Sequence, residues 1–125
     1  MRRTIVLGLV LVMSAVALAS DKKDVKLNGY VIDNACSARA TGDTALEKVK
    51  AHSTKCAQMP NCAKSGYAIY ADGQLYKFDE DGNKKVADLL KNTKSEKGLG
   101  VSVEGTLDGD ILHANKIVES AEAMK

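Results

Sequence analysis

The sequence predicts a mostly β, α+β fold in which five strands enclose one core and two helical regions connect them. Five stretches are expected to be strands, and two of them, at 25–32 and 99–107, alternate apolar and polar residues, a pattern that is typical of half-buried strands. Asp-Gly pairs at 72–73 and 108–109 mark tight turns between such stretches. Two further stretches, after Thr44 and after Asn83, place apolar residues at helical spacing. Alternation, turn pairs and helical spacing together define the class.

The composition is that of an ordinary globular protein, with 45% apolar and 27% charged residues in a chain of 125. A chain of this length forms one domain. The same composition argues against disorder, collagen and coiled coils. The formal charge of +2 excludes a strongly basic nucleic-acid binder.

The first 19 residues have the layout of a secretory signal peptide. A basic start is followed by an apolar stretch at 5–18, and Ala17 and Ala19 supply the small residues that a signal peptidase reads. The apolar stretch is shorter than the ~20 residues that a membrane-spanning helix needs. We therefore expect cleavage between Ala19 and Ser20, a mature domain at 20–125, and no stable membrane anchor after processing.

Cleavage would also change the charge of the chain. It removes two of the 18 basic residues and leaves as many basic as acidic residues, of which there are 16. A neutral domain has no electrostatic attraction to nucleic acid or to anionic lipid. We expect a periplasmic or extracellular location, no nucleic-acid partner, and another exported protein as the class of any macromolecular partner.

The order of the expected elements predicts the architecture. Strands are expected, in chain order, at 25–32, 67–71, 74–79, 99–107 and 111–118. A helix with Asn83 as its N-cap is expected between strands three and four, and Gly29 indicates a bulge or bend in strand one. Without the segment at about 36–65, the order β-β-β-α-β-β is that of a five-stranded OB-type barrel. A sheet covered by two helices is the alternative.

The segment at about 36–65, here called the excursion, lies in the first interstrand connection, which OB-folds use for binding. Thr44 is followed three residues later by an acidic residue, the spacing of a capping box, so a helix is expected from there through Ser53 or beyond. Pro60 ends that helix and can begin a second helical turn, which stops at Gly66.

Three cysteines remain after export: Cys36, Cys56 and Cys62. An odd number in an oxidising compartment favours one disulfide and one leftover thiol. Cys36 follows the first expected strand and Cys62 precedes the second. Because these two strands should be antiparallel neighbours, the two cysteines should lie close together. Cys56 and Cys62 would be about 9 Å apart along an unbroken helix, beyond the ~7 Å limit for a disulfide. We expect a Cys36–Cys62 disulfide and a free thiol at Cys56.

The leftover thiol has neighbours that can bind metal. His52, Cys56 and Met59 stand at i, i+4 and i+7, so an unbroken helix would present all three on one face. Imidazole, thiolate and thioether together suit Cu(I), or Zn(II) if the methionine is not a ligand. We expect a small exported binding module with a soft-metal site at these residues, copper(I) before zinc.

Two other interpretations stay open. The residues Ala45, Val49, His52, Cys56 and Met59 can instead form the buried stripe of one helix, in a disulfide-stapled structural or protein-interaction domain without metal. A thiol enzyme would use Cys56 as nucleophile and His52 as base. The sequence shows no orienting partner and no oxyanion donor for such an enzyme, so a non-enzymatic role is favoured.

Other patterns have simpler explanations. The acidic run from Asp79 lacks the residues that a calcium loop needs, since Lys84 stands at the sixth position and Leu90 at the twelfth. His113 is expected at the surface, between two buried neighbours. Asp33, close to Cys36, is expected to form a turn or to support the site.

The chain resembles a group of small exported bacterial proteins. The resemblance rests on Gly29-Tyr-Val-Ile-Asp-Asn-Ala-Cys36, on His52-x3-Cys56-x2-Met59-x2-Cys62-x2-Ser-Gly-Tyr67, and on the Asp-Gly turn with Tyr-Lys-Phe-Asp79. It covers most of residues 27–118, and the Cys/His segment is its specific part. It implies an exported OB-like domain and brings no activity or ligand.

Overall fold

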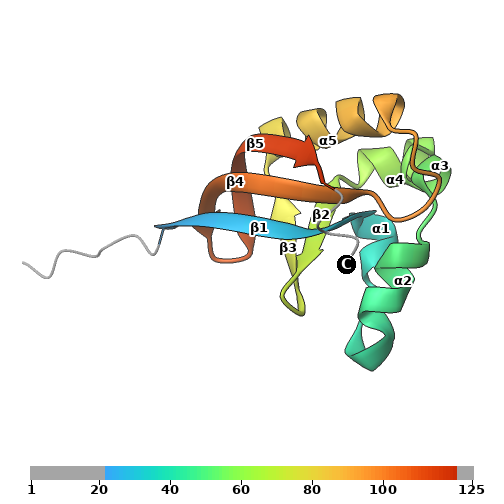
Figure 1. Cartoon of the computed structure of the whole chain (residues 1–125), viewed down its shortest axis with the longest axis horizontal. Helices are drawn as coiled ribbons and strands as arrows, with labels where there is room; N and C mark the ends of the chain where they lie inside the picture. Colours follow the sequence, from blue (N-terminus) through green and yellow to red (C-terminus); the bar gives the residue numbers. More distant parts are fainter. Residues whose placement is uncertain (1–21, 121–125) are drawn as a thin grey trace, which may run out of the picture.

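Five strands close into a barrel in the computed structural model, which describes residues 22–120 (Figure 1). They are β1 (Lys22–Asp33), β2 (Tyr67–Ala71), β3 (Gln74–Phe78), β4 (Gly100–Asp108) and β5 (Ile111–Glu119). Their order around the barrel is β1-β2-β3-β5-β4, with β3 and β5 parallel and every other pair antiparallel. The predicted mostly β, OB-like fold is confirmed, with the strands within one or two residues of their expected ends apart from the start of β1.

The long first strand belongs to both halves of the barrel. Lys22–Tyr30 pairs with β4, and Tyr30–Asp33 pairs with β2. Gly29 lies at this change of partner, where a Cβ atom would collide with the carbonyl of Tyr70. Glycine is therefore required for a close approach of two strands, while the bulge of the sheet lies elsewhere, at Glu104 and Gly105.

The excursion between β1 and β2 consists of four short helices and a 3-10 turn. They are α1 (Asn34–Ser37), the turn η1 (Gly42–Thr44), α2 (Ala45–Ala51), α3 (Thr54–Ala57) and α4 (Pro60–Lys64). The expected continuous helix from Thr44 past Ser53 is wrong, because His52 and Ser53 have extended backbone. Thr44 makes no capping hydrogen bond through its side chain. Pro60 does begin a helix, as expected, and Gly66 follows α4 with a φ of +81°.

Helix α5 (Glu80–Asn92) connects β3 to β4, as predicted, and lies along β5 (Figure 1). Its N-cap is Asp79 rather than the expected Asn83, because the Asp79 Oδ1 atom accepts a hydrogen bond of 2.8 Å from the Gly82 N–H. Asn83 instead accepts the N–H of Tyr67, which ties α5 to the start of β2.

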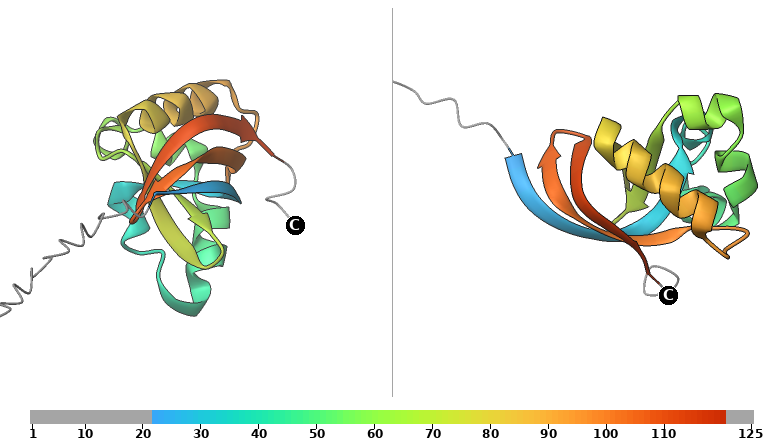
Figure 2. Two further views of the ribbon diagram at one scale, coloured as in Figure 1. Left: turned by 90° about the vertical axis from the view of Figure 1, so that its left-hand side faces the viewer. Right: turned by 90° about the horizontal axis from the view of Figure 1, so that it is seen from above.

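The core has two parts. The larger part fills the barrel beneath α5, with Ile69, Leu112 and Val86 among its fully buried members. The smaller part lies between the barrel wall and α2, where Val49 packs among Tyr30 and neighbouring side chains. The excursion therefore has its own apolar base and stands at one end of the barrel (Figure 2).

The expected signal peptide and the Ala19–Ser20 cleavage site lie outside the described residues. Within residues 22–120, no helix has the length and apolar character needed to cross a membrane.

Candidate metal centre

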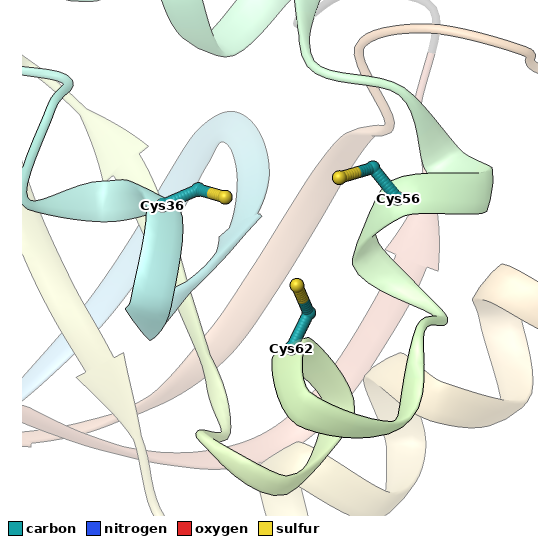
Figure 3. A group of neighbouring side chains, drawn as sticks. All are labelled: Cys36, Cys56 and Cys62. Atoms are coloured by element: carbon teal, nitrogen blue, oxygen red, sulfur yellow. The ribbon is translucent and has the colours of Figure 1, made fainter.

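The three cysteines meet at the end of the barrel. Cys36 comes from α1, Cys56 from α3 and Cys62 from α4, and their side chains point toward one another (Figure 3). Their Sγ atoms all lie within 4.8 Å of each other, and each residue is half-buried. Three separate helices thus supply one thiol each to the same point.

The local sequence explains how each thiol reaches this point, because each cysteine is the third residue of its helix. Asp33 caps α1 and accepts the N–H of Cys36 at 2.9 Å. Ser53 caps α3 and accepts the N–H of Cys56 at 3.4 Å. Helix α4 begins at Pro60, two residues before its cysteine. The capping residues and Pro60 determine where the three helices begin, and the start of each helix positions its cysteine.

Asp33 is the charged residue at the base of the cluster, and it is completely buried. Its Oδ2 atom caps α1, and its Oδ1 atom lies 2.7 Å from the Nε2 atom of His52. An Asp33 carboxylate oxygen also lies within 4.8 Å of the Cys36 sulfur. The sequence allowed a turn-forming role or a supporting role for Asp33, and the structure combines both.

Burial and this carboxylate keep two of the thiols protonated. Burial, followed by the negative charge of Asp33, raises the pKa of Cys36 to about 12. The same two causes raise the pKa of Cys62, against a smaller lowering by the neighbouring Cys36 thiol. A metal ion that binds here must displace the thiol protons, because thiolates are the form that coordinates metals.

His52 lies beside Cys36 rather than in line with Cys56. A ring nitrogen of His52, a carboxylate oxygen of Asp33 and the Cys36 sulfur form a second group of potential ligands, all within 4.8 Å of one another. The imidazole is only 12% exposed. If Nε2 donates its proton to Asp33, Nδ1 keeps the lone pair that a metal would require.

The position of His52 depends on the loop before β4. Its carbonyl accepts the N–H of Gly98 at 3.0 Å, and Ser53 forms a β-bridge with Lys97. Gly98 has a φ of +64°, and a Cβ atom there would meet the backbone of Lys50 at 2.6 Å. This close approach holds the excursion where α2 ends and α3 begins.

Met59 does not share a helix face with the other predicted ligands. His52 ends α2, Cys56 lies in α3, and Met59 precedes α4, so the spacing argument for one helix is wrong. Met59 is 55% exposed, which also rules it out of the alternative buried stripe. Ala45 and Val49 of that stripe are buried, as the packing interpretation expected.

The expected Cys36–Cys62 disulfide is not formed in this structure, in which all three cysteines are free thiols. The distance argument against a Cys56–Cys62 disulfide is also wrong. It assumed an unbroken helix, whereas Cys56 and Cys62 lie in two separate helices, α3 and α4, and all three sulfurs lie close together.

A pocket of about 470 Å³ opens beside the thiols. Its lining includes Cys36, Cys56 and His52, and two basic residues, Arg39 and Lys48. Solvent and a small ion can therefore reach two of the three thiols.

Comparison with known proteins adds no relative to this picture: no family model matches the chain, and neither the curated proteins nor the solved structures give a significant match.

Sequence reasoning found all three cysteines and His52 but missed that Cys36 and Cys62 join Cys56. A signal was present: Asp33-x-x-Cys36 and Ser53-x-x-Cys56 each place a capping residue three positions before a cysteine. Interpreted as two helix starts, these patterns would have replaced one long helix by short ones.

Proposed function

We propose that this chain is a small exported, periplasmic binding module that holds one Cu(I) ion through the thiolates of Cys36, Cys56 and Cys62. The observation that carries the proposal is the convergence of three sulfurs from three helices to within 4.8 Å. Thiolates bound at about 2.3 Å around a tetrahedral metal ion are about 3.8 Å apart. Sulfurs that all lie within 4.8 Å of one another therefore need at most a small movement to reach that arrangement.

The donor set favours copper(I). Three thiolates are soft ligands, which select Cu(I) or Zn(II) over ions such as Mg²⁺ and Ca²⁺. A structural zinc site almost always takes four protein ligands. Here the fourth would have to be His52, which lies within 4.8 Å of the Cys36 sulfur but is not part of the group that the three cysteine sulfurs form. Cu(I) needs no such fourth ligand, so zinc is the rival ion in the experiment.

The proposed ligands revise the set expected from sequence. Cys56 is retained, and Cys36 and Cys62 take the place of Met59. His52 becomes a neighbour of the ion, oriented by Asp33 as histidines at metal sites commonly are by carboxylates.

A thiol enzyme is supported less well. The Asp33–His52 contact supplies the orienting partner that the sequence did not reveal. However, the thiol that lies beside this pair is that of Cys36. Burial and the charge of Asp33 raise the pKa of Cys36 to about 12. A nucleophilic cysteine requires the opposite shift.

The test is an anaerobic competition for Cu(I) between the reduced, exported protein and a chromophoric Cu(I) chelator. We expect the wild type to take up one Cu(I) and the variants Cys36→Ser, Cys56→Ser and Cys62→Ser each to lose this ability. Met59→Leu is the matched control and should bind as the wild type does. A parallel titration with Zn(II) distinguishes the two ions.

Two results would reject the proposal. In the first, the wild type takes no copper from the chelator. In the second, the single cysteine variants bind as tightly as the wild type while circular dichroism shows that they are folded. The export part is tested separately by intact mass, where a mature chain that still begins at Met1 would contradict it.

A further inference from the structure

Cys36 and Cys62 lie on helices that are far apart in the sequence but are joined by hydrogen bonds. The start of α1 is bound to the end of α4 by the Asn34 N–H, which donates to the carbonyl of Gly66 at 2.9 Å. The Asn34 Nδ2 atom donates to the carbonyl of Ser65 at 2.9 Å, and the Ala35 N–H donates to the Ser65 hydroxyl at 3.1 Å. Helices α1 and α4 therefore form one hydrogen-bonded unit.

Helix α3, which carries Cys56, is anchored elsewhere. Thr54 donates through its N–H to the carbonyl of Glu96 and through its hydroxyl to the carbonyl of Ser95, both in the loop before β4. The hydroxyl of Tyr67 donates to the carbonyl of Ala57 at 2.9 Å. The unit of α1 and α4 therefore carries two thiols, and a differently anchored helix carries the third.

The two thiols of this unit are close neighbours, and their side chains point toward one another (Figure 3). Their sulfurs lie within 4.8 Å, and a disulfide requires an S–S distance of about 2.05 Å. Half-buried thiols can close this gap by side-chain rotation, because helices α1 and α4 already pack against each other.

We propose that the centre is a redox switch, in which a disulfide between Cys36 and Cys62 replaces the metal ion. This inference rests on the proposed Cu(I) function and adds its regulation. The reduced state presents three thiols to the ion. The oxidised state retains one thiol, Cys56, which cannot hold Cu(I) alone. Metal binding and disulfide formation then exclude each other.

The oxidant is an exogenous disulfide, RSSR, of the class that thiol–disulfide exchange consumes. One protein thiol loses its proton, a step that the raised pKa of Cys36 and Cys62 makes slow at neutral pH, and its thiolate attacks RSSR to form a mixed disulfide and release RS⁻. The second thiolate attacks the protein sulfur of that mixed disulfide and releases the second RS⁻. The two thiols lose two electrons and two protons in total, and the products are the internal disulfide and two RSH.

The test uses the reduced, metal-free, exported chain, incubated anaerobically with oxidised glutathione and mapped by mass spectrometry without reduction. We expect a linked Cys36–Cys62 peptide pair, the loss of two hydrogen masses, and a free thiol at Cys56. The oxidised protein should fail to take Cu(I) from the chelator and should regain this ability after reduction. Loading with Cu(I) beforehand should slow the oxidation, because thiolates bound to the ion are not free to attack the disulfide.

Two variants make the assignment specific. Cys56→Ser should form the same disulfide as the wild type, although it does not bind Cu(I). Cys36→Ser should form no link to Cys62. Met59→Leu serves as the control in both measurements.

Three outcomes would overturn the switch: only mixed disulfides with glutathione, an internal link in which Cys56 is the main partner, or an oxidised protein that binds Cu(I) as tightly as the reduced one. A reduced wild type that takes no Cu(I) ends the proposed function and the switch together, and this failure is recognised from the reduced sample alone.

Discussion

The carboxylate of Asp33 has three kinds of partner: the N–H of Cys36, the ring of His52, and the thiols that face it. A buried carboxylate is costly unless its oxygens are hydrogen-bonded, and these contacts satisfy both oxygens. The same residue thus begins a helix, orients a histidine and keeps the nearby thiols protonated. Its charge and its capping role can be separated by substitution.

The substitution Asp33→Asn removes the charge and keeps a side chain that caps helices well. Burial and Asp33 both raise the pKa of Cys36, so removing the carboxylate should lower this pKa from about 12 while leaving the contribution of burial. Alkylation of Cys36 by iodoacetamide, followed by mass spectrometry across the pH range, should then begin at lower pH. Asp43→Asn, at an exposed site, is the control. An unchanged pH profile would show that Asp33 does not control this thiol.

Two His–Asp pairs allow burial to be tested with matched chemistry. His52 and Asp33 have side chains that are 12% and 0% exposed, whereas His113 and Asp79 are 45% and 23% exposed. His52→Leu should lower the free energy of unfolding by about 1–3 kcal/mol, because it leaves a buried carboxylate oxygen without a partner. His113→Leu should cost less than about 1 kcal/mol, as exposed pairs do. Urea denaturation measures both, and equal losses would contradict the difference in burial.

At the scale of elements, strands and helices differed in how well the sequence predicted them. Alternation indicates which face of a strand is buried and located β1 and β4. The Asp-Gly turns at 72–73 and 108–109 located the other strands. The helical spacing of Ala45, Val49, His52 and Cys56 was compatible with one long helix. The break at His52 depends on Ser53 as a cap and on the close approach of Gly98 to the end of α2. Gly98 lies 45 residues after Ser53 in the chain, so no local pattern relates them, and only the tertiary structure brings them together.

Gly98 and Gly109 test that break, because both have a positive φ, of +64° and +63°. A Cβ atom at Gly109 meets nothing within 4 Å, whereas one at Gly98 would meet the backbone of Lys50. Gly109→Ala should therefore cost only the strain of its φ, about 1 kcal/mol. Gly98→Ala should cost more and should also weaken Cu(I) binding, since it displaces the segment that leads to Cys56. Equal unfolding free energies for the two variants would show that the loop yields without effect on the excursion.

On the scale of the whole molecule, the barrel has a large core and most of the excursion packs against a smaller one. The barrel interior is filled by the large apolar cluster, which Ala57 of α3 also joins. The rest of the excursion packs on a small cluster around Val49 and Tyr30. The order of strands and the location of the cysteine segment in the first connection were predicted from sequence. The meeting of three thiols was not, because it depends on how α1, α3 and α4 are oriented by their caps and by hydrogen bonds to distant loops.

This division of the core predicts where a bound metal ion will act. Segments with few buried apolar contacts open locally before the whole protein unfolds, so amides in the excursion should exchange faster than those of β4 and β5. Cu(I) would join three helices and would bind the closed excursion in preference to the open one. Adding Cu(I) to the reduced protein should therefore slow hydrogen exchange at α1, α3 and α4 more than in β4 and β5, as measured by mass spectrometry of peptides. Cys56→Ser should show the original rates with and without copper. Equal slowing in the barrel and the excursion would mean that the ion does not act through these three helices.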